Sequence, residues 1–484
     1  MSEKGTPTSS LASPAEIIAL DPKAEAKLRR KLDFLVLPIV SISYTFLFLD
    51  RGNIGNAKAA GLEKAIGLHT FDFNIGTCLF YLIFILCEIP CALLVKRFGF
   101  WIIPVSVFSF GIVTMASAFI HNRAGFYATR IALGLTESFA LPGINYLLTR
   151  YYRRSELTSR IGCFLLVAAG SSGAFGGLLA AGLLRLGKIG NRSSWQNIFL
   201  VEGIITAGFA IVSFPFFPAD PMKTRMLTEE ERQLAIARIY ADQPEIKDPK
   251  ESINRTLIKR GIFNPTTMAC TWLFIVGNSS VQGLGIFLPS ILQVNYPDAS
   301  TIRIQILVVP IYITAGIIAL FMTIGCIKTR RHFPFALFAG ACTIAGYSIW
   351  IATDSTFAKA RYAACFLNMT GGFTTGPVVL GWAASNASPD TVRAMVGAVV
   401  TGFGGFGSIA GVWAYVQTDA VTGYHKGNAF NLSMSASLIV VTLGLFAYQW
   451  YENKRREQGY RDYRLEKGGI DQLGSLHPSY RYVY

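Results

Sequence analysis

Apolar and polar residues alternate along this chain in long blocks. About twelve mostly apolar runs, each close to 20 residues or longer, are separated by polar connections. A helix of about 20 apolar residues spans a membrane, and the runs lack the period-two alternation of barrel strands. The pattern predicts an all-α membrane protein with twelve transmembrane helices in two six-helix halves, at 33–52, 74–95, 101–120, 125–149, 158–184, 196–217, 265–292, 304–327, 333–352, 360–385, 394–416 and 428–451.

The longest polar interruption separates six spans from six. Within it, Thr228 and Glu231 have the spacing of a helix capping box, and residues 232–240 have the pattern of a short amphipathic helix. Two six-helix halves around a central loop are typical of transporters that bind substrate between the halves near the membrane midplane. The expected organisation is an N-terminal tail, a first half, a central cytoplasmic loop, a second half and a C-terminal tail, at 1–32, 33–217, 218–263, 264–452 and 453–484.

The charge distribution predicts the orientation in the membrane. Hydrophobic residues make up 52% of the chain and charged residues only 15%, while the net charge is +15. With both tails on one side, that side carries 32 lysines and arginines against 10 on the other, and two more lie within spans. The positive-inside rule then places both termini in the cytoplasm, and the basic excess indicates contact with anionic lipid rather than nucleic acid. The first 30 residues contain no apolar signal region, so the first span is expected to act as an uncleaved insertion signal.

The first span contains adjacent charges at membrane depth, Asp50 and Arg51. A charged side chain there costs roughly 3 kcal/mol, and such residues usually line an ion or substrate path. Neighbours in a helix point about 100° apart, so each needs a partner on another helix. Arginine suits anion capture because its planar fork binds a carboxylate with two hydrogen bonds. A structural ion pair is the alternative.

Other acidic and basic residues also fall within the first six spans. Arg130 and Glu137 are seven residues apart and share a helix face. An apolar setting favours the protonated form of a carboxyl group, so Glu137 is a candidate proton carrier, with a fixed Arg130–Glu137 network as the alternative. We expect Arg130, Glu88 and Glu202 to form structural charge pairs.

The second half offers neutral polar residues at depth instead. We expect Asn278, Gln282, Asn368 and Thr374 to select the substrate by hydrogen bonding; Thr375 and Asn386 are similar in kind. Each of these side chains could instead bind neighbouring helices together. The hypothesis is an asymmetric site, in which the first half holds charge and protons and the second half supplies neutral contacts.

Several other functions are disfavoured by the sequence. The eight cysteines lie in apolar runs without C-x-x-C spacing, which argues against zinc binding and disulfides. The five histidines lie at span edges, in connections or in the tail, and no phosphate-binding Gly-Lys-Ser/Thr loop is present. We therefore expect no enzyme activity, cofactor or metal. Asn191 begins a glycosylation sequon in a predicted outer loop.

Local strings resemble the major facilitator superfamily, specifically its anion:cation symporter family and the fungal allantoate-permease branch. The strings are Phe48-Leu-Asp-Arg-Gly-Asn-Ile-Gly-Asn-Ala57, Cys87-Glu-Ile-Pro90, Lys96-Arg-Phe-Gly99, Arg130-Ile-Ala-Leu-Gly-Leu-Thr-Glu137, Glu202-Gly203, Leu227-Thr-Glu-Glu-Glu-Arg232, Trp382 with Asn386, and His477-Pro-Ser-Tyr-Arg-Tyr-Val-Tyr484. They are spread along the sequence, and the resemblance covers essentially the whole chain. The resemblance implies that Arg51 binds a substrate carboxylate, while Asp50 and Glu137 carry coupling protons. At Phe84 and at Thr401 and Gly405 the chain departs from the residues usual in these relatives, which affects substrate identity rather than mechanism.

The expected function is import of a small organic anion together with protons by a monomer in the plasma membrane. Allantoate, nicotinate, pantothenate, biotin and dicarboxylates are candidates from the resemblance. The alternatives are an exporter or facilitator of a metabolite on the same scaffold, and a nutrient sensor that does not transport. The tail after the last span, of about 33 residues, is short for such a sensor.

Overall fold

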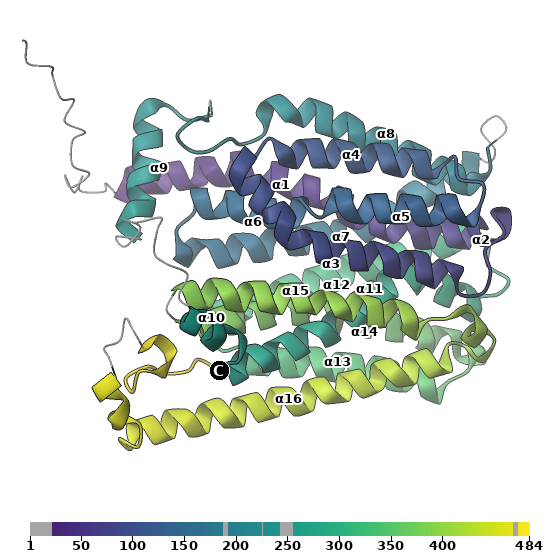
Figure 1. Ribbon diagram of the computed structural model, residues 1–484. Helices are drawn as coiled ribbons and strands as arrows, with labels where there is room; N and C mark the ends of the chain where they lie inside the picture. Colours follow the sequence, from purple (N-terminus) through teal and green to yellow (C-terminus); the bar gives the residue numbers. More distant parts are fainter. Residues whose placement is uncertain (1–21, 187–191, 225, 243–254, 389, 468–472) are drawn as a thin grey trace, which may run out of the picture.

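The structure is a computed structural model that describes residues 22–186, 192–224, 226–242, 255–388, 390–467 and 473–484. Long helices run side by side along one axis (Figure 1). The predicted site of glycosylation, Asn191, lies outside the described residues. All other candidate residues lie within them.

Each of the twelve predicted spans corresponds to a helix. Before the central region these are α1 (Pro22–Ala59), α3 (Asp72–Phe98), α4 (Ile102–Ser117), α5 (Arg123–Glu137) followed directly by α6 (Ala140–Tyr151), α7 (Arg154–Leu186) and α8 (Ser194–Ser213). After it they are α11 (Pro265–Asn295), α12 (Thr301–Thr329), α13 (Phe333–Ala352), α14 (Ala358–Ser385), α15 (Asp390–Ala414) and α16 (His425–Glu457). The all-α architecture predicted from the sequence is confirmed.

The helices have the length and composition of membrane spans. Ten stretches among the described residues are long and apolar enough to cross a membrane, with α5 and α6 counted together as one of them. α4 is apolar but shorter, and α14 is long but is not among the ten most apolar stretches. Large apolar side chains such as Phe34, Ile89 and Phe321 are exposed on the outside of the bundle, as expected where the solvent is lipid.

The central region contains two helices. The predicted amphipathic helix is α9 (Glu229–Asp242), and its capping box is formed: Thr228 N donates to Glu231 Oε2 at 3.0 Å, and Glu231 N donates to Thr228 Oγ1 at 3.3 Å. Lys31 binds the same carboxylate, so together these contacts lower the pKa of Glu231. The second helix, α10 (Arg255–Ile262), was not predicted. It was missed because it has only eight residues and ends just before Pro265, and because its basic composition is typical of a loop.

Glycines allow helices from before and after the central region to pack closely. The glycine-rich face of α7 lies against α12, where a Cβ on Gly173 would overlap the Tyr312 ring. A Cβ on Gly407 of α15 would in the same way overlap the backbone of Ile275 in α11. Small residues permit such close backbone contact. The helices that surround the site are therefore held at short distances.

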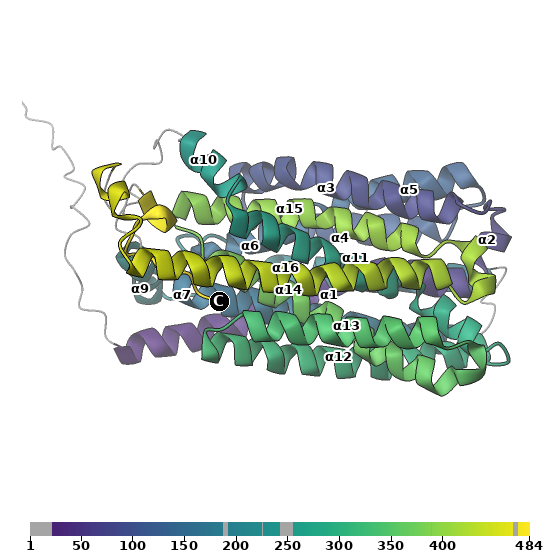
Figure 2. The same cartoon turned by 90° about the horizontal axis from the view of Figure 1, so that it is seen from below.

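The two ends of the bundle differ. We call them the α9 end, where α1 begins and α16 finishes, and the α2 end, where the short helix α2 (Leu62–Ala65) lies (Figure 1; Figure 2). At the α2 end, Asn74 Nδ2 on α3 donates to the carbonyls of Val412 and Tyr415 at 2.7 and 3.1 Å. Close by, the ring of Phe73 meets that of Phe287 edge-on. The first and second sets of helices are thus joined at the α2 end.

Candidate functional site

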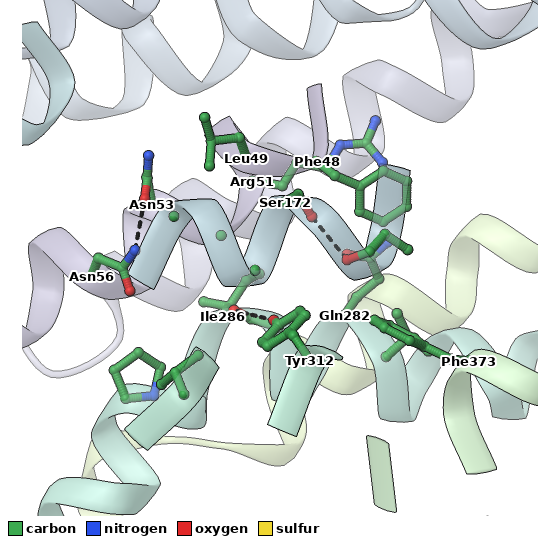
Figure 3. A pocket seen from close by; sticks show the side chains of 18 residues that line it. Phe48, Leu49, Arg51, Asn53, Asn56, Ser172, Gln282, Ile286, Tyr312 and Phe373 are labelled. Carbon is green, nitrogen blue, oxygen red and sulfur yellow. Dashed lines mark hydrogen bonds between the residues drawn. The ribbon is translucent and has the colours of Figure 1, made fainter. Parts of the chain in front are cut away.

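A cavity lies between the first six and the second six membrane helices, beside the last third of α1. The space not filled by protein atoms, including its open mouth, is about 530 Å³. α1 and α7 form one wall, and α11, α12 and α14 form the other. It is lined by Phe48, Leu49, Arg51, Gly52, Asn53, Asn56, Ala169, Ser172, Gly173, Gly176, Val281, Gln282, Gly285, Ile286, Pro289, Val308, Tyr312 and Phe373 (Figure 3).

Arg51 is the only charged residue among the lining residues. Its Nε lies 3.0 Å from Glu137 Oε2 on α5, and both side chains are almost fully buried. The guanidinium carbon also lies 4.4 Å from the ring centre of Phe84 and 5.4 Å from that of Phe80. Nη2 has no hydrogen-bond partner among the described residues. Arg51 is therefore anchored on one side, and its Nη2 is a buried donor that no described residue binds.

The neighbouring Asp50 points elsewhere, as adjacent positions on a helix require. Its Oδ1 accepts a hydrogen bond from Thr114 Oγ1 on α4 at 2.7 Å. The carboxyl group of Asp50 also acts electrostatically on Glu137. A nearby like charge disfavours the ionised form of a carboxyl group. Glu137, which pairs with Arg51, is therefore the candidate proton-binding group of the site.

Two more buried charged residues complete this group. Glu202 on α8 accepts a hydrogen bond from Asn53 Nδ2, and Asn53 Oδ1 accepts one from Asn56 at 2.7 Å. Arg130 lies where it acts electrostatically on Asp50, Glu137 and Glu202, and its Nη2 reaches Ser117 at 3.4 Å. We call the five residues Asp50, Arg51, Arg130, Glu137 and Glu202 the charge cluster.

The charge cluster contains three carboxyl groups and two guanidinium groups, and all five residues are almost fully buried. With every group ionised it would carry one net negative charge. An uncompensated charge away from water is costly, so the cluster is most stable with one proton bound. Binding of an anion at Arg51 would bring a further negative charge and favour uptake of a further proton.

The second-half candidates are divided. Gln282 lines the cavity, and its Oε1 accepts a hydrogen bond from Tyr81 on α3 at 3.0 Å. Asn278 instead donates to the Gly404 carbonyl of α15 at 3.0 Å. Thr374 bonds to the Thr370 carbonyl in its own helix, and its neighbour Phe373 lines the cavity instead. Asn368 is fully buried and lies outside the cavity wall.

Sequence reasoning missed most of the aromatic lining. Phe48, Tyr312 and Phe373 contribute to the walls, and Tyr81 holds Gln282 in place. In an apolar span such residues look like ordinary packing, so the sequence contains no signal that separates them. Glu88, predicted to form a structural pair, is half-buried and forms no ion pair within the part of the chain that the structure describes.

No group of three or more histidine, cysteine, aspartate or glutamate side chains that could hold a metal ion occurs among the described residues. The described cysteines are all free.

A cavity at mid-depth between two sets of membrane helices, with a buried arginine in its wall, defines a multi-pass membrane transporter. The family model of the Major Facilitator Superfamily matches residues 40–412. The chain belongs to this superfamily.

Relatives in fungi align over almost the whole chain. The uncharacterized transporter C11D3.18C of Schizosaccharomyces pombe is 31% identical, covering 96% of this chain and 91% of the relative. A second uncharacterized transporter of that yeast, C1039.04, is 30% identical over 91% of this chain and 86% of the relative. The MFS-type transporter efuF of Hormonema carpetanum is 28% identical over 96% and 93%.

Solved structures share the fold at low sequence identity. A D-xylose-proton symporter superimposes with a TM-score of 0.65 at 14% identity, covering 85% of this chain and 97% of that one. A bacterial homologue of the human lysosomal transporter Spinster, in an inward-facing and occupied conformation, gives 0.60 at 16% identity over 85% and 95%. These likenesses concern the fold of the twelve helices.

Proposed function

We propose that this protein is a proton-coupled symporter that imports a small organic anion carrying a carboxylate. The observation that carries the proposal is the Arg51–Glu137 ion pair at the cavity wall. A guanidinium in a cavity wall with a donor that has no protein partner can bind a carboxylate. The acid that pairs with the guanidinium can take up a proton when a substrate carboxylate replaces it.

The coupling follows from charge balance in the cavity. Before substrate binds, Glu137 pairs with Arg51. A substrate carboxylate that binds Arg51 replaces Glu137, and Glu137, beside Asp50, then takes up a proton because an unpaired carboxylate is costly at this depth. The loaded site has the same net charge as the empty one. Substrate and proton therefore cross together.

The cavity wall formed by α11, α12 and α14 has only uncharged residues, and we call it the neutral wall. It supplies selectivity in this proposal. Gln282 offers an amide beside Arg51, and Tyr312 and Phe373 form apolar surfaces opposite α1. A buried amide that loses its partner rejects substrates that cannot hydrogen-bond to it. We infer a small, compact anion with at least one polar group besides the carboxylate.

We further propose that the α9 end faces the cytoplasm, in keeping with the excess of basic residues there. The contacts that join the helices at the α2 end then close the outer side. Transport would proceed by rocking of residues 33–217 against residues 264–452 in the plasma membrane, within a single copy of the chain. The D-xylose-proton symporter fold is compatible with proton coupling of this kind.

The test is uptake into liposomes that contain the purified protein, measured with a panel of labelled carboxylates at two external pH values. Wild type should accumulate one of them when the outside is acidic, and a protonophore should abolish the accumulation. Glu137→Gln should keep exchange of labelled for unlabelled substrate but lose accumulation driven by pH. Glu88→Gln removes a carboxyl group outside the charge cluster and serves as the control.

Three outcomes would contradict the proposal. Accumulation by Glu137→Gln that responds to pH as wild type does would contradict the role of this residue. Uptake that no pH gradient influences, in wild type, would replace symport with facilitated diffusion. Accumulation when the inside is acidic would favour an exporter.

A further inference from the structure

Residues 473–484, which we call the return segment, lie against the ends of α14 and α16 at the α9 end (Figure 1; Figure 2). Two asparagines bind its backbone. Asn386, at the end of α14, donates to the Val483 carbonyl at 2.7 Å and accepts from Val483 N at 2.8 Å. Asn453 of α16 does the same with Tyr482, at 2.9 and 2.8 Å. Each side-chain amide therefore mimics the backbone of a neighbouring strand.

Further polar groups add to these pairs. Trp382 Nε1 lies 3.0 Å from the Val483 carbonyl, and Arg456 Nη1 lies 2.9 Å from the Tyr480 carbonyl. Closer to the start of the segment, Ser475 N donates to the Ser388 carbonyl at 3.0 Å. Backbone groups recognised in this way give affinity without depending on side-chain identity.

The side chains of the segment alternate in the manner of an extended strand. Tyr482 is buried beside Tyr448 and under the guanidinium of Arg456, whose central carbon lies 4.7 Å from the ring centre. Tyr484, two residues on, meets Phe446 edge-on at 5.1 Å. Val483 and Tyr484 are both partly buried, and only Tyr482 is buried. The rings of Tyr482 and Tyr484 therefore supply the side-chain contacts of the segment.

The receiving groups are polar, and Asn386, Asn453 and Trp382 are almost completely covered when the segment is in place. Without the segment, each asparagine would lose the two hydrogen bonds that it forms with it, and the indole N–H of Trp382 would keep only Gln449. Each hydrogen bond of this kind contributes to stability. The segment therefore stabilises the helix ends that it covers.

We propose that the ends of α14 and α16 form a docking surface for an extended peptide, and that the return segment of the same chain is its occupant. The segment contacts both helices through consecutive residues, so it ties one to the other. α14 carries Phe373 in the cavity wall. The tie therefore fixes, at the α9 end, a helix that shapes the cavity.

Hydrogen exchange in the purified full chain tests the contact without any substrate. The amide hydrogens of Tyr482 and Val483 should exchange far more slowly than in a free peptide of the same sequence. The double variant Asn386→Ala with Asn453→Ala removes four hydrogen bonds to the segment and should accelerate their exchange at least about 10-fold. Exchange in wild type at the rate of the free peptide would overturn the proposal.

A matched pair of substitutions separates backbone recognition from general damage. Val483→Pro removes the N–H that Asn386 accepts and should lower the melting temperature of the detergent-solubilised protein. Val483→Ala keeps the N–H and should leave it within about a degree of wild type. Equal effects of the two substitutions would overturn backbone recognition.

Adding the segment in trans tests the occupant. A chain that stops after Lys467 should bind a synthetic peptide of residues 473–484 and recover at least half of the lost melting temperature, while a scrambled peptide should not. Failure to bind would overturn the docking surface. In the full chain, protection that rises with protein concentration would show a second copy as the occupant and overturn the intramolecular tie.

Discussion

Two buried arginines in this molecule are held in opposite ways. Arg361 of α14 donates to four neutral oxygens, those of Asn295 Oδ1 at 2.6 Å and of the Trp350, Thr353 and Gly423 carbonyls at 3.0, 2.7 and 3.1 Å. Arg51 has one carboxylate, three aromatic rings and a free donor. Arg361 is therefore a fixed part of the scaffold. Arg51 still has a donor to which a ligand could bind.

The partners of the two arginines differ in whether they can bind a proton, and this indicates which buried charge has a function in transport. Carbonyl oxygens cannot be protonated at any relevant pH, so the surroundings of Arg361 have only one state. The partner of Arg51 is an acid beside a second acid, so its surroundings have a protonated and an ionised state. A buried charge contributes to transport when its partners can change, and to stability when they cannot.

The largest effect is expected at Arg51. Arg51→Gln should reduce uptake of the anion at least about 100-fold, because a buried charge pair with a ligand is worth several kcal/mol. The melting temperature should hold or rise, since Glu137 can become neutral once its partner is gone. Arg51→Lys keeps the charge without the fork and should also transport poorly. Uptake by Arg51→Gln near the wild-type rate would remove the contrast with Arg361.

The charge cluster shows how much of the site the sequence reveals. Charges within apolar runs are rare enough to stand out, so Asp50, Arg51 and Glu137 could be selected from the sequence, and the structure brings them together. Membrane spans are equally clear, because apolar length alone predicts them. The break between α5 and α6 and the short α10 have no such signal.

The neutral wall was harder to predict, because its composition depends on which helices approach each other. Asn278 and Gln282 are four residues apart and share a face of α11. Yet Gly407 lets α15 approach Asn278 closely, and the amide is used there, while Gln282 remains in the cavity. In a span where every position is apolar or small, periodicity does not identify the face that meets the cavity.

The next effect is on stability, at Arg361. Arg361→Leu should destabilise the protein by about 3–5 kcal/mol, since four oxygen atoms lose their donor and the side chain sits at a junction of three connections. The melting temperature in detergent would show it, with Arg393→Leu, near the α9 end of α15, as a surface control. The few correctly folded molecules should bind substrate with wild-type affinity. A normal melting temperature with lost binding would instead place Arg361 in the site.

The smallest effect concerns a third buried basic residue, His332. No described residue forms a hydrogen bond with its Nδ1, and we expect the ring to stay neutral at physiological pH. It lies between α12 and α13, stacked parallel to Trp382, and burial lowers its pKa to about 4. In the unfolded chain a histidine has a pKa near 6.5, so the unfolded state binds more protons between these values. Stability from this residue is therefore complete above about pH 6.5 and falls as the pH drops toward 4, by about 2 kcal/mol at pH 5.

His332→Phe keeps a ring on Trp382 but cannot bind a proton, so it isolates this contribution. Between pH 8 and pH 5 the melting temperature of wild type should fall further than that of the variant, and the two should agree more closely above pH 7. Parallel curves would mean that His332 finds an acceptor when protonated and behaves as Arg361 does. A larger fall in wild type would show that a buried base without a partner is tolerated only while uncharged, which is the condition that Arg51 escapes by keeping an acid beside it.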